Sequence, residues 1–214
     1  MPLSSPCWQA VFFDFDGVIA DSTDVKLRAF AALFADFGPE VQQAVIRYHR
    51  DNGGMPRHEK IRHCYAVLAG HPLDEAGLEQ AGRTFSSLVL DAVVAAPLIP
   101  GALETLETLH QSGIPAIVVS GTPGDEMRSI VERKGLAPFF LEVHGSPQVK
   151  PGIVAGILAR HGYRPDRCLF VGDALADYRA AQANGLHFLG IVPSNQASIF
   201  PPDTPISSTV TLAC

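Results

Sequence analysis

The stretch that decides the fold reads Ala10-Val11-Phe12-Phe13-Asp14-Phe15-Asp16-Gly17-Val18. Its apolar first half is typical of a buried β-strand, and its second half places two carboxylates one residue apart, before a glycine. Because residues two apart in a strand point the same way, Asp14 and Asp16 are predicted to leave the strand end close together, unless a turn begins between them. Two adjacent carboxylates repel, so they need a proton or a cation. The pair indicates a metal site or a nucleophile beside an acid/base, and a plain turn is the alternative that this stretch leaves open.

Apolar runs of strand length recur along the chain, with helix-length segments between the later ones. The predicted strands cover residues 10–15, 115–120, 140–144, 168–172 and 187–192. Most are continuous rather than alternating, as in parallel strands that are covered on both faces. Helices are predicted over 102–111, 151–161 and 174–184, and over a segment with Thr122 as N-cap and Pro123 at the first helical position. Strands that alternate with helices predict a doubly wound parallel α/β sheet.

Residues 21–97 break this alternation, because they contain no convincing strand. Leu27, Phe30 and Phe34 keep helical spacing, and breaks fall at Gly and Pro clusters, so three or four helices are predicted. We therefore expect a core made of residues 1–20 and 98–214 and an inserted helical domain over 21–97. At the carboxyl edge of a sheet such an insertion acts as a lid or only packs on the core, and the pattern leaves both open.

The composition excludes several classes of protein. The chain has 214 residues, 47% hydrophobic, and a net charge of −6 without a run of basic residues, so nucleic acid and anionic membranes are not expected partners. Cys7, Cys64, Cys168 and Cys214 are scattered, which predicts reduced thiols in a cytoplasmic protein. The N-terminal residues lack the pattern of a signal peptide, and no apolar stretch is long enough to span a membrane.

Polar residues follow several of the predicted strands, where ligands bind in an open α/β sheet. Ser120 and Gly121 follow the second strand and precede a helix, a place where phosphate is often bound. Asp173 and Asp177 follow the fourth strand at the start of another helix, and Lys150 precedes Pro151 at a helix start. Each segment alone is explained by capping or by a solvated surface charge. Together, carboxylates suited to Mg²⁺ and a lysine and hydroxyl suited to phosphate indicate metal-assisted phosphoryl transfer.

The motifs in this order resemble those of the haloacid dehalogenase-like hydrolase superfamily. The motifs are Asp14-Phe15-Asp16-Gly17-Val18, Ser120-Gly121-Thr122, Lys150-Pro151 and Gly172-Asp173-Ala174-Leu175-Ala176-Asp177, and together they cover nearly the whole chain. The chain is most similar to the phosphoglycolate phosphatase and β-phosphoglucomutase group. The resemblance implies a Rossmann-like core with an inserted helical cap, and an Mg²⁺-dependent phosphatase that acts on a small phosphorylated metabolite as a monomer or homodimer.

The resemblance also implies roles for individual residues. Asp14 is the nucleophile that forms an aspartyl-phosphate, and Asp16 is the acid/base, with a pKa that a closed cap raises. Mg²⁺ is held by Asp14, by the backbone carbonyl of Asp16 and by Asp173. The remaining residues support this centre: Ser120, Gly121 and Lys150 bind phosphate, and Asp177 supports the metal site without binding the metal itself.

Specificity is expected to lie in the cap, in the loop that begins at Gly53-Gly54-Met55-Pro56. Arg57 follows this loop and is the candidate contact for a substrate carboxylate or hydroxyl, with a basic helix start on the cap surface as the alternative. The presence of Asp16 argues against cleavage of carbon–halogen bonds, because the dehalogenase branch of the superfamily lacks this second aspartate. A β-phosphoglucomutase-like phosphomutase and a non-catalytic ligand-binding protein on the same fold remain as alternatives. The segment after Pro193 matches no motif and is expected to be a surface tail, with a segment that is ordered at an interface as the alternative.

Overall fold

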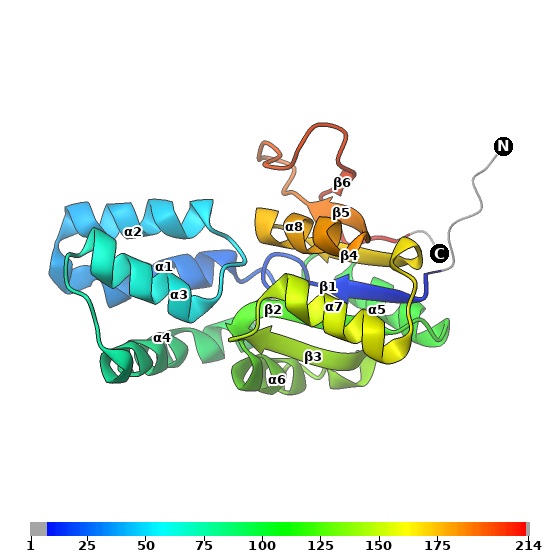
Figure 1. Ribbon diagram of the computed structural model, residues 1–214, viewed down its shortest axis with the longest axis horizontal. Helices are drawn as coiled ribbons and strands as arrows, with labels where there is room; N and C mark the ends of the chain where they lie inside the picture. The colour runs from blue at the N-terminus through cyan, green and yellow to red at the C-terminus, as the bar shows by residue number, and fades with distance from the viewer. Residues whose placement is uncertain (1–7, 213–214) are drawn as a thin grey trace.

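The core of the computed structural model, which describes residues 8–212, is a six-stranded parallel sheet (Figure 1). Its strands lie in the order β3-β2-β1-β4-β5-β6. Their bounds are Ala10–Phe13 (β1), Ala116–Pro123 (β2), Phe140–Ser146 (β3), Cys168–Gly172 (β4), His187–Ile191 (β5) and Ile206–Ser207 (β6). The predicted doubly wound sheet is confirmed. The chain moves outward from β1 in both directions, so the ends of β1 and β4 flank the point where ligands bind in such sheets.

Helices cover both faces of the sheet, as the continuous apolar strands require. On one face lie α5 (Ala102–Gln111) and α6 (Gly124–Arg133), whose buried residues join the cluster that contains Val11 and Phe13. On the other face lie α7 (Lys150–His161) and α8 (Leu175–Asn184), whose buried residues join the cluster that contains Ala10 and Phe12. The four residues of β1 thus alternate between the two core layers, and none is exposed.

The segment between β1 and α5 is helical and lies at one end of the sheet (Figure 1). Its elements are α1 (Thr23–Leu33), η1 (Ala35–Phe37), α2 (Pro39–Asp51), α3 (Arg57–His63), η2 (Cys64–Leu68) and α4 (Glu75–Ala95). Phe30, Phe34 and Phe85 are buried where these helices meet. This helical insertion therefore has an apolar centre of its own.

Two linkers join the helical insertion to the sheet, and they pair with each other. Ala20 and Leu98 form an antiparallel bridge. The Asp21 N–H donates to the Pro97 carbonyl at 2.9 Å, and the Ile99 N–H donates to the Ile19 carbonyl at 3.0 Å. The insertion is thus attached through a short two-stranded ribbon rather than through two independent linkers.

The predicted helix start at Thr122 and Pro123 is wrong. Strand β2 continues to Pro123, which is in register with Ser146 of β3, and α6 begins at Gly124. The Thr122 side chain does not cap a helix; its Oγ1 accepts a hydrogen bond from Lys26 Nζ at 2.6 Å. Two long-range contacts, one with a neighbouring strand and one with α1, therefore outweigh the local capping signal. At the other predicted boundary, β1 ends at Phe13 rather than at residue 15.

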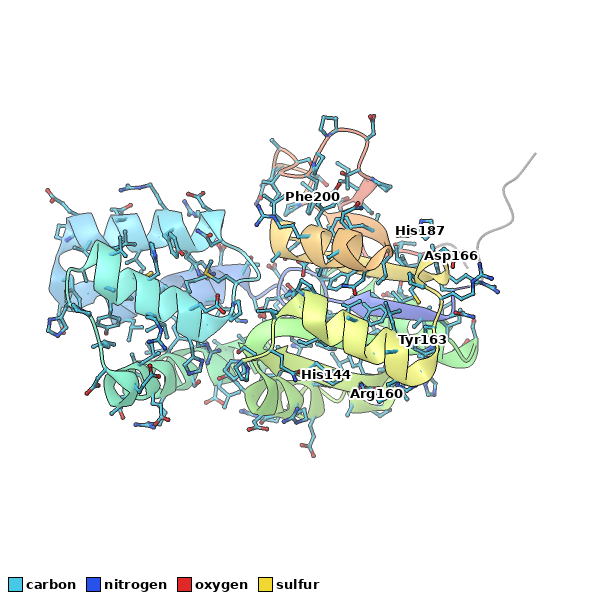
Figure 2. The ribbon with its side chains drawn as sticks, in the orientation of Figure 1. His144, Arg160, Tyr163, Asp166, His187 and Phe200 are labelled. Atoms are coloured by element: carbon cyan, nitrogen blue, oxygen red, sulfur yellow. The ribbon has the colours of Figure 1, made fainter. Side chains whose placement is uncertain are left out.

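The segment after Pro193 is not only a surface tail. Its residues 206–207 add the edge strand β6, and the Phe200 ring packs at 5.1 Å from the Phe188 ring and 6.4 Å from the Tyr178 ring (Figure 2). Further on, the Val210 N–H donates to the Pro100 carbonyl at 2.9 Å, and Thr105 Oγ1 donates to the Val210 carbonyl at 2.5 Å. This segment closes the core beside β5 and reaches the second linker.

Cys64 and Cys168 are buried free thiols, whereas the predictions for Cys7 and Cys214 fall outside the described residues. Within residues 8–212, no helix has the length and apolarity needed to cross a bilayer.

We predict that Phe200→Ala lowers the free energy of unfolding by about 3 kcal/mol, because it leaves a cavity against Phe188 and Tyr178. Ile199→Ala is the matched control, since Ile199 is 57% exposed and exposed positions change stability by roughly 0.5 kcal/mol or less. Unfolding in urea measures the free energy of unfolding of both variants. An equal, small effect of the two substitutions would contradict the packing described for this segment.

Candidate active site

Three carboxylates converge at the carboxyl edge of the sheet. Asp14 follows β1, Asp173 follows β4, and Asp177 lies in the first turn of α8. One oxygen from each lies within 4.8 Å of the others. The Asp14 N–H donates to the Val171 carbonyl at 3.0 Å, which continues the pairing of β1 with β4 and brings the two strand ends together. The first and last predicted motifs therefore meet at one place.

A buried lysine neutralises part of this charge. Lys150 is the first residue of α7, and its Nζ lies 3.0 Å from Asp14 Oδ1 and 2.6 Å from Asp177 Oδ1. Burial alone would lower the pKa of the Lys150 ammonium, but these two carboxylates raise it above its ordinary value. Lys150 is therefore protonated at neutral pH, and it fixes the side chains of Asp14 and Asp177.

Among the described residues 8–212, no ion pair is found for Asp173, although the charge of Lys150 acts on it from a distance. Burial raises the pKa of Asp173 well above its ordinary value, and the neighbouring Asp14 and Asp177 carboxylates raise it further. Three carboxylates that share one ammonium leave an excess of negative charge. Clustered carboxylate oxygens are the donors that a hard cation such as Mg²⁺ takes, so this donor set fits the predicted metal.

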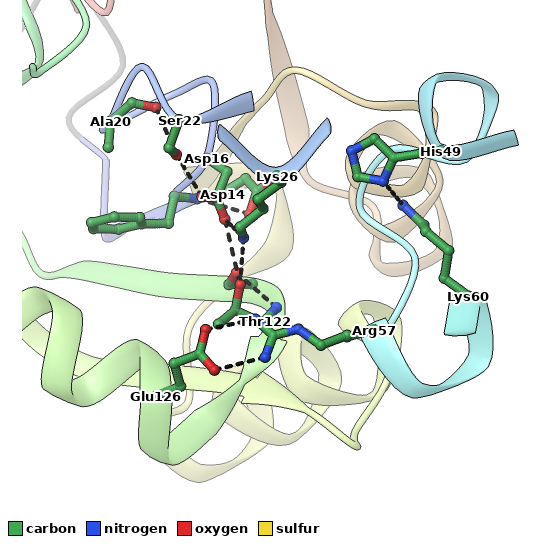
Figure 3. A network of polar contacts seen from close by, with 12 residues as sticks. Asp14, Asp16, Ala20, Ser22, Lys26, His49, Arg57, Lys60, Thr122 and Glu126 are labelled. Carbon is green, nitrogen blue, oxygen red and sulfur yellow. Dashed lines mark hydrogen bonds and ion pairs between the residues drawn. The ribbon is translucent and has the colours of Figure 1, made fainter. Parts of the chain in front are cut away.

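Asp16 faces a different set of groups. Its Oδ1 accepts a hydrogen bond from Ser22 Oγ at 2.6 Å, and its Oδ2 forms an ion pair with Lys26 Nζ (Figure 3). Burial raises the pKa of Asp16, but the charge and hydrogen bond of Lys26 and the hydrogen bond of Ser22 together hold it below its ordinary value. The sequence-based expectation of a raised pKa is thus wrong for this closed arrangement. Asp14 and Asp16 do not share a cation; each has its own lysine.

Gly17 permits the close approach of the end of β1 to the end of β4. Its φ of +81° is one that residues with a side chain rarely adopt. A Cβ at this position would also overlap the carboxylate of Asp173. The glycine of the first motif is therefore required both by the turn and by the contact between β1 and β4.

The predicted phosphate-binding residues lie next to these carboxylates, at the end of β2. Ser120 is 1% exposed, and its Oγ accepts a hydrogen bond from the Thr122 N–H at 3.1 Å. A Cβ on Gly121 would lie 2.9 Å from the Gly54 carbonyl oxygen and 3.0 Å from that of Met55. Gly121 therefore lets the loop of the helical insertion approach the backbone of the sheet edge.

That loop closes a cleft between the helical insertion and the sheet. The cavity between them has a volume of about 90 Å³. Its floor includes Asp14, Asp16, Asp173, Ser120 and Gly121, and its roof includes Gly53, Gly54, Met55, Lys60 and His49. The loop at residue 53 thus lines the same cleft as the predicted site residues Asp14 and Ser120.

Arg57 links the two parts of the molecule (Figure 3). Its guanidinium makes two hydrogen bonds of 2.6 Å to the Glu126 carboxylate, which belongs to α6, and one of 2.7 Å to Ser86 Oγ of α4. Both partners of the Arg57–Glu126 pair are buried, with side-chain exposures of 4% and 9%. The contact of Arg57 with a substrate stays a prediction; in this structure its charge is neutralised by Glu126.

The sequence interpretation gave no role of their own in the site to Lys26, His49, Lys60 and Thr122, which line the cleft, or to Glu126, which pairs with Arg57. One signal was available for Lys26. It precedes Phe30 by four residues, so both lie on one face of α1, and the apolar spacing of that face predicts that it is buried. No local signal marks the other four, because their contacts join segments that are far apart along the chain.

Comparison with known proteins agrees with this geometry. A family model described as haloacid dehalogenase-like hydrolase matches residues 8–185. A phosphoglycolate phosphatase of Aliivibrio fischeri is 30% identical over 185 residues, which are 83% of this chain and 81% of that protein. A phosphoglycolate phosphatase of Vibrio parahaemolyticus is 29% identical over 85% of this chain and 82% of its own length. The crystal structure of β-phosphoglucomutase from Clostridium difficile shares the fold, with a TM-score of 0.73 at 16% identity over 86% of this chain and 85% of that one.

We predict that Lys26→Met raises the pKa of Asp16 above its ordinary value, because burial then acts without the opposing ammonium. The measurement is a ¹³C NMR titration of the aspartate carboxyl carbons in metal-free protein, with the signal assigned through Asp16→Asn. Lys26→Arg is the control and keeps the pKa low. An unchanged Asp16 titration in Lys26→Met would show that the ion pair is not formed in solution.

Proposed function

The chain belongs to the haloacid dehalogenase-like hydrolase family, and from this premise we propose that it is an Mg²⁺-dependent phosphatase that hydrolyses a small phosphorylated metabolite through an aspartyl-phosphate. One observation supports this most strongly. The Asp14 carboxylate is 4% exposed, has Lys150 at 3.0 Å, and is one of three convergent carboxylates on the floor of the cleft. The ammonium of Lys150 pairs with this carboxylate, and burial shelters it from bulk water, as a nucleophile requires.

In the proposed first step, an Asp14 oxygen forms a bond to the substrate phosphorus while the bond from phosphorus to the ester oxygen breaks. Asp16 donates a proton to the leaving oxygen, so the product departs as an alcohol. Because Lys26 and Ser22 hold the pKa of Asp16 below its ordinary value in this arrangement, this step requires the ion pair with Lys26 to break when the substrate binds, so that Asp16 takes up the proton it donates.

In the proposed second step, Asp16 is a carboxylate and accepts a proton from a water molecule. The water oxygen attacks phosphorus, and the bond between phosphorus and Asp14 breaks, which releases inorganic phosphate and restores the Asp14 carboxylate. The ion pair with Lys26 stabilises the ionised form of Asp16 that this step needs. Two displacements thereby replace one difficult attack by water.

The surrounding groups are assigned to binding and charge neutralisation. Ser120 and the Gly121 backbone bind phosphate oxygens, and Lys150 neutralises charge on Asp14 and on the phosphoryl group. Asp14, Asp173 and the Asp16 backbone carbonyl are proposed to hold Mg²⁺, which supplies further stabilisation of the negative charge that develops on the phosphoryl oxygens. Asp177 is assigned a supporting role, because Lys150 Nζ and the Ala174 N–H at 3.1 Å already bind its two oxygens.

We assign residues 21–97 to the cap and residues 1–20 and 98–214 to the core. The cap excludes water while the phosphoryl group is transferred, and it opens to admit substrate and release product. The buried free thiols of Cys64 and Cys168 support work in a reducing, cytoplasmic compartment, and the protein is proposed to act as a monomer or homodimer.

We predict that the protein releases phosphate from p-nitrophenyl phosphate only with Mg²⁺ and that Asp14→Asn abolishes turnover, because the amide is a poor nucleophile and a weaker metal ligand. Release of p-nitrophenol is followed with and without EDTA. Asp203→Asn, a change at an exposed turn far along the chain, is the control and retains activity. Activity that survives both EDTA and Asp14→Asn would overturn the mechanism.

Asp16→Asn is expected to reduce turnover by at least about 100-fold, since general acid–base catalysis contributes roughly 10²–10⁴-fold. Mg²⁺ affinity is expected to change little, because the proposed metal contact at this position is a backbone carbonyl. Calorimetric titration with Mg²⁺ and steady-state kinetics are run on the same preparation. Parallel losses of affinity and turnover would instead make the Asp16 side chain a metal ligand.

The same residues also suit a phosphomutase, and one experiment separates the two. A panel of phosphorylated metabolites is incubated with and without a sugar bisphosphate, and both free phosphate and sugar phosphate isomers are measured. A phosphatase releases phosphate without the bisphosphate. Isomers that interconvert without net release of phosphate would select the mutase.

A further inference from the structure

A buried ion pair joins the cap to the core, and none of the steps proposed above uses it. Arg57 is the first residue of α3 in the cap, and Glu126 lies in the first turn of α6 in the core. Arg57 Nη1 donates to Glu126 Oε2 and Nη2 donates to Oε1, each at 2.6 Å (Figure 3). Ser86 of α4 adds a further donor from the cap, since its Oγ donates to Oε2 at 2.6 Å. Both oxygens of the Glu126 carboxylate are therefore bound by cap residues.

The two charges of this pair depend on each other. Burial raises the pKa of Glu126, but the hydrogen bonds and charge of Arg57 and the hydrogen bond of Ser86 hold it below its ordinary value, so the carboxylate is ionised at neutral pH. The N-terminus of α6 also favours a negative charge in its first turn. If one partner were removed while the cap stayed closed, the other would be left as an unpaired buried charge, which is costly.

The pair lies away from the linkers about which the cap must turn. Helix α4 packs along α6, and beside the second linker Lys134 Nζ donates to the carbonyls of Val94 and Ala96 at 2.9 and 2.6 Å. Ser86 lies roughly 15 Å further along α4 than Ala96, at a rise of about 1.5 Å per residue. An outward rotation of the cap would therefore separate Arg57 and Ser86 from Glu126, while the contacts of Lys134 near the linker would move less.

Arg57 also fixes the loop that covers the phosphate-binding residues. Gly54 and Met55 come shortly before Arg57, and their carbonyls lie against Gly121 at the end of β2. A Cβ on Gly54 would lie 2.9 Å from Ala176 Cβ and 3.5 Å from Lys150 Nζ. An anchor at Arg57 thus holds this loop over both β2 and Lys150.

The other charged contact between cap and core cannot serve as a permanent anchor. Lys26 of α1 pairs with Asp16 and donates to Thr122 Oγ1 at 2.6 Å. In the proposed first step Lys26 must release Asp16, so this contact changes during the reaction. The Arg57–Glu126 pair includes no residue to which a step of the reaction is assigned, and it can persist through both displacements.

We propose that Arg57, Ser86 and Glu126 form a latch that keeps the cap closed over Asp14 when no substrate is bound. The assignment rests on the proposed phosphatase function and on the division into cap and core. Arg57 and Glu126 are then positioning residues, and closure is a property of the chain that a substrate does not have to induce. The latch must open for substrate to enter and product to leave, so its strength sets how often the cleft is accessible.

The test measures how often the cleft opens, with Lys60 as the reporter, because it lines the cleft and is 3% exposed. The protein is treated with N-hydroxysuccinimidyl acetate, with Mg²⁺ and without substrate, and mass spectrometry gives the acetylation rate of each lysine relative to the urea-unfolded chain. We expect slow acetylation of Lys60 in the wild-type protein and a rate at least about 10-fold higher in Glu126→Gln. Glu132→Gln, an exposed change on the same helix, is the matched control and leaves the rate unchanged.

A double variant distinguishes a latch from ordinary packing. Arg57→Met leaves the Glu126 charge unpaired, and Glu126→Gln leaves the Arg57 charge unpaired. When both substitutions are combined, no buried charge is left, so Lys60 should be acetylated more slowly than in either single variant. Side chains that contribute only packing would instead give effects that add.

Three results would overturn the latch. The first is acetylation of Lys60 in the wild-type protein as fast as in the unfolded chain, and the second is an unchanged rate in Glu126→Gln. The third is an equal acceleration at Lys134, which would show that α4 has left the core as a whole. Phosphate release from p-nitrophenyl phosphate is measured on the same preparations. If the wild-type protein releases none with Mg²⁺, the proposed function fails, whereas the acetylation rates still decide whether the latch exists.

Discussion

The repulsion among carboxylates at one edge of the sheet constrains much of this structure. Asp14, Asp16, Asp173 and Asp177 arrive there from the ends of only two strands. Lys150 neutralises charge from the core side, whereas the ion pair of Asp16 requires Lys26, which belongs to the helical insertion. The insertion must therefore lie against the sheet for Asp16 to be compensated. Charge neutralisation thus couples the position of the helical insertion to the charge state of these carboxylates.

Much of the fold and the central carboxylates could be predicted because their signals are local. A strand that is buried on both faces is apolar at every position, so the strands over 140–144, 168–172 and 187–192 were found to within two residues. Parallel strands place their carboxyl ends at one edge, so Asp14 and Asp173 could be expected to meet without any knowledge of distances. The fold and the floor of the cleft depend on these two regularities.

The roof of the cleft could not be predicted in this way. Its residues come from helices whose mutual arrangement depends on packing over the whole insertion, so a basic helix start such as Arg57-His58-Glu59-Lys60 does not reveal which side chain faces the sheet. The structure separates them: Arg57 meets a carboxylate of α6, while Lys60 does not. The edge strand β6 was missed for a related reason, since two residues that pair with a distant strand have no periodicity to detect.

The two-stranded ribbon at Ala20 and Leu98 has a consequence for how the chain folds. Strand β1 must pair with β2 across the whole insertion, and closing a flexible loop of that length costs on the order of 4 kcal/mol in chain entropy. Once the insertion has folded and the ribbon has formed, the two ends are already adjacent, since Ala20 bridges Leu98. The remaining closure from β1 to β2 is then that of a short connection. The insertion interrupts the core in the sequence, but it need not slow the assembly of the core, provided that the helices of the insertion form first.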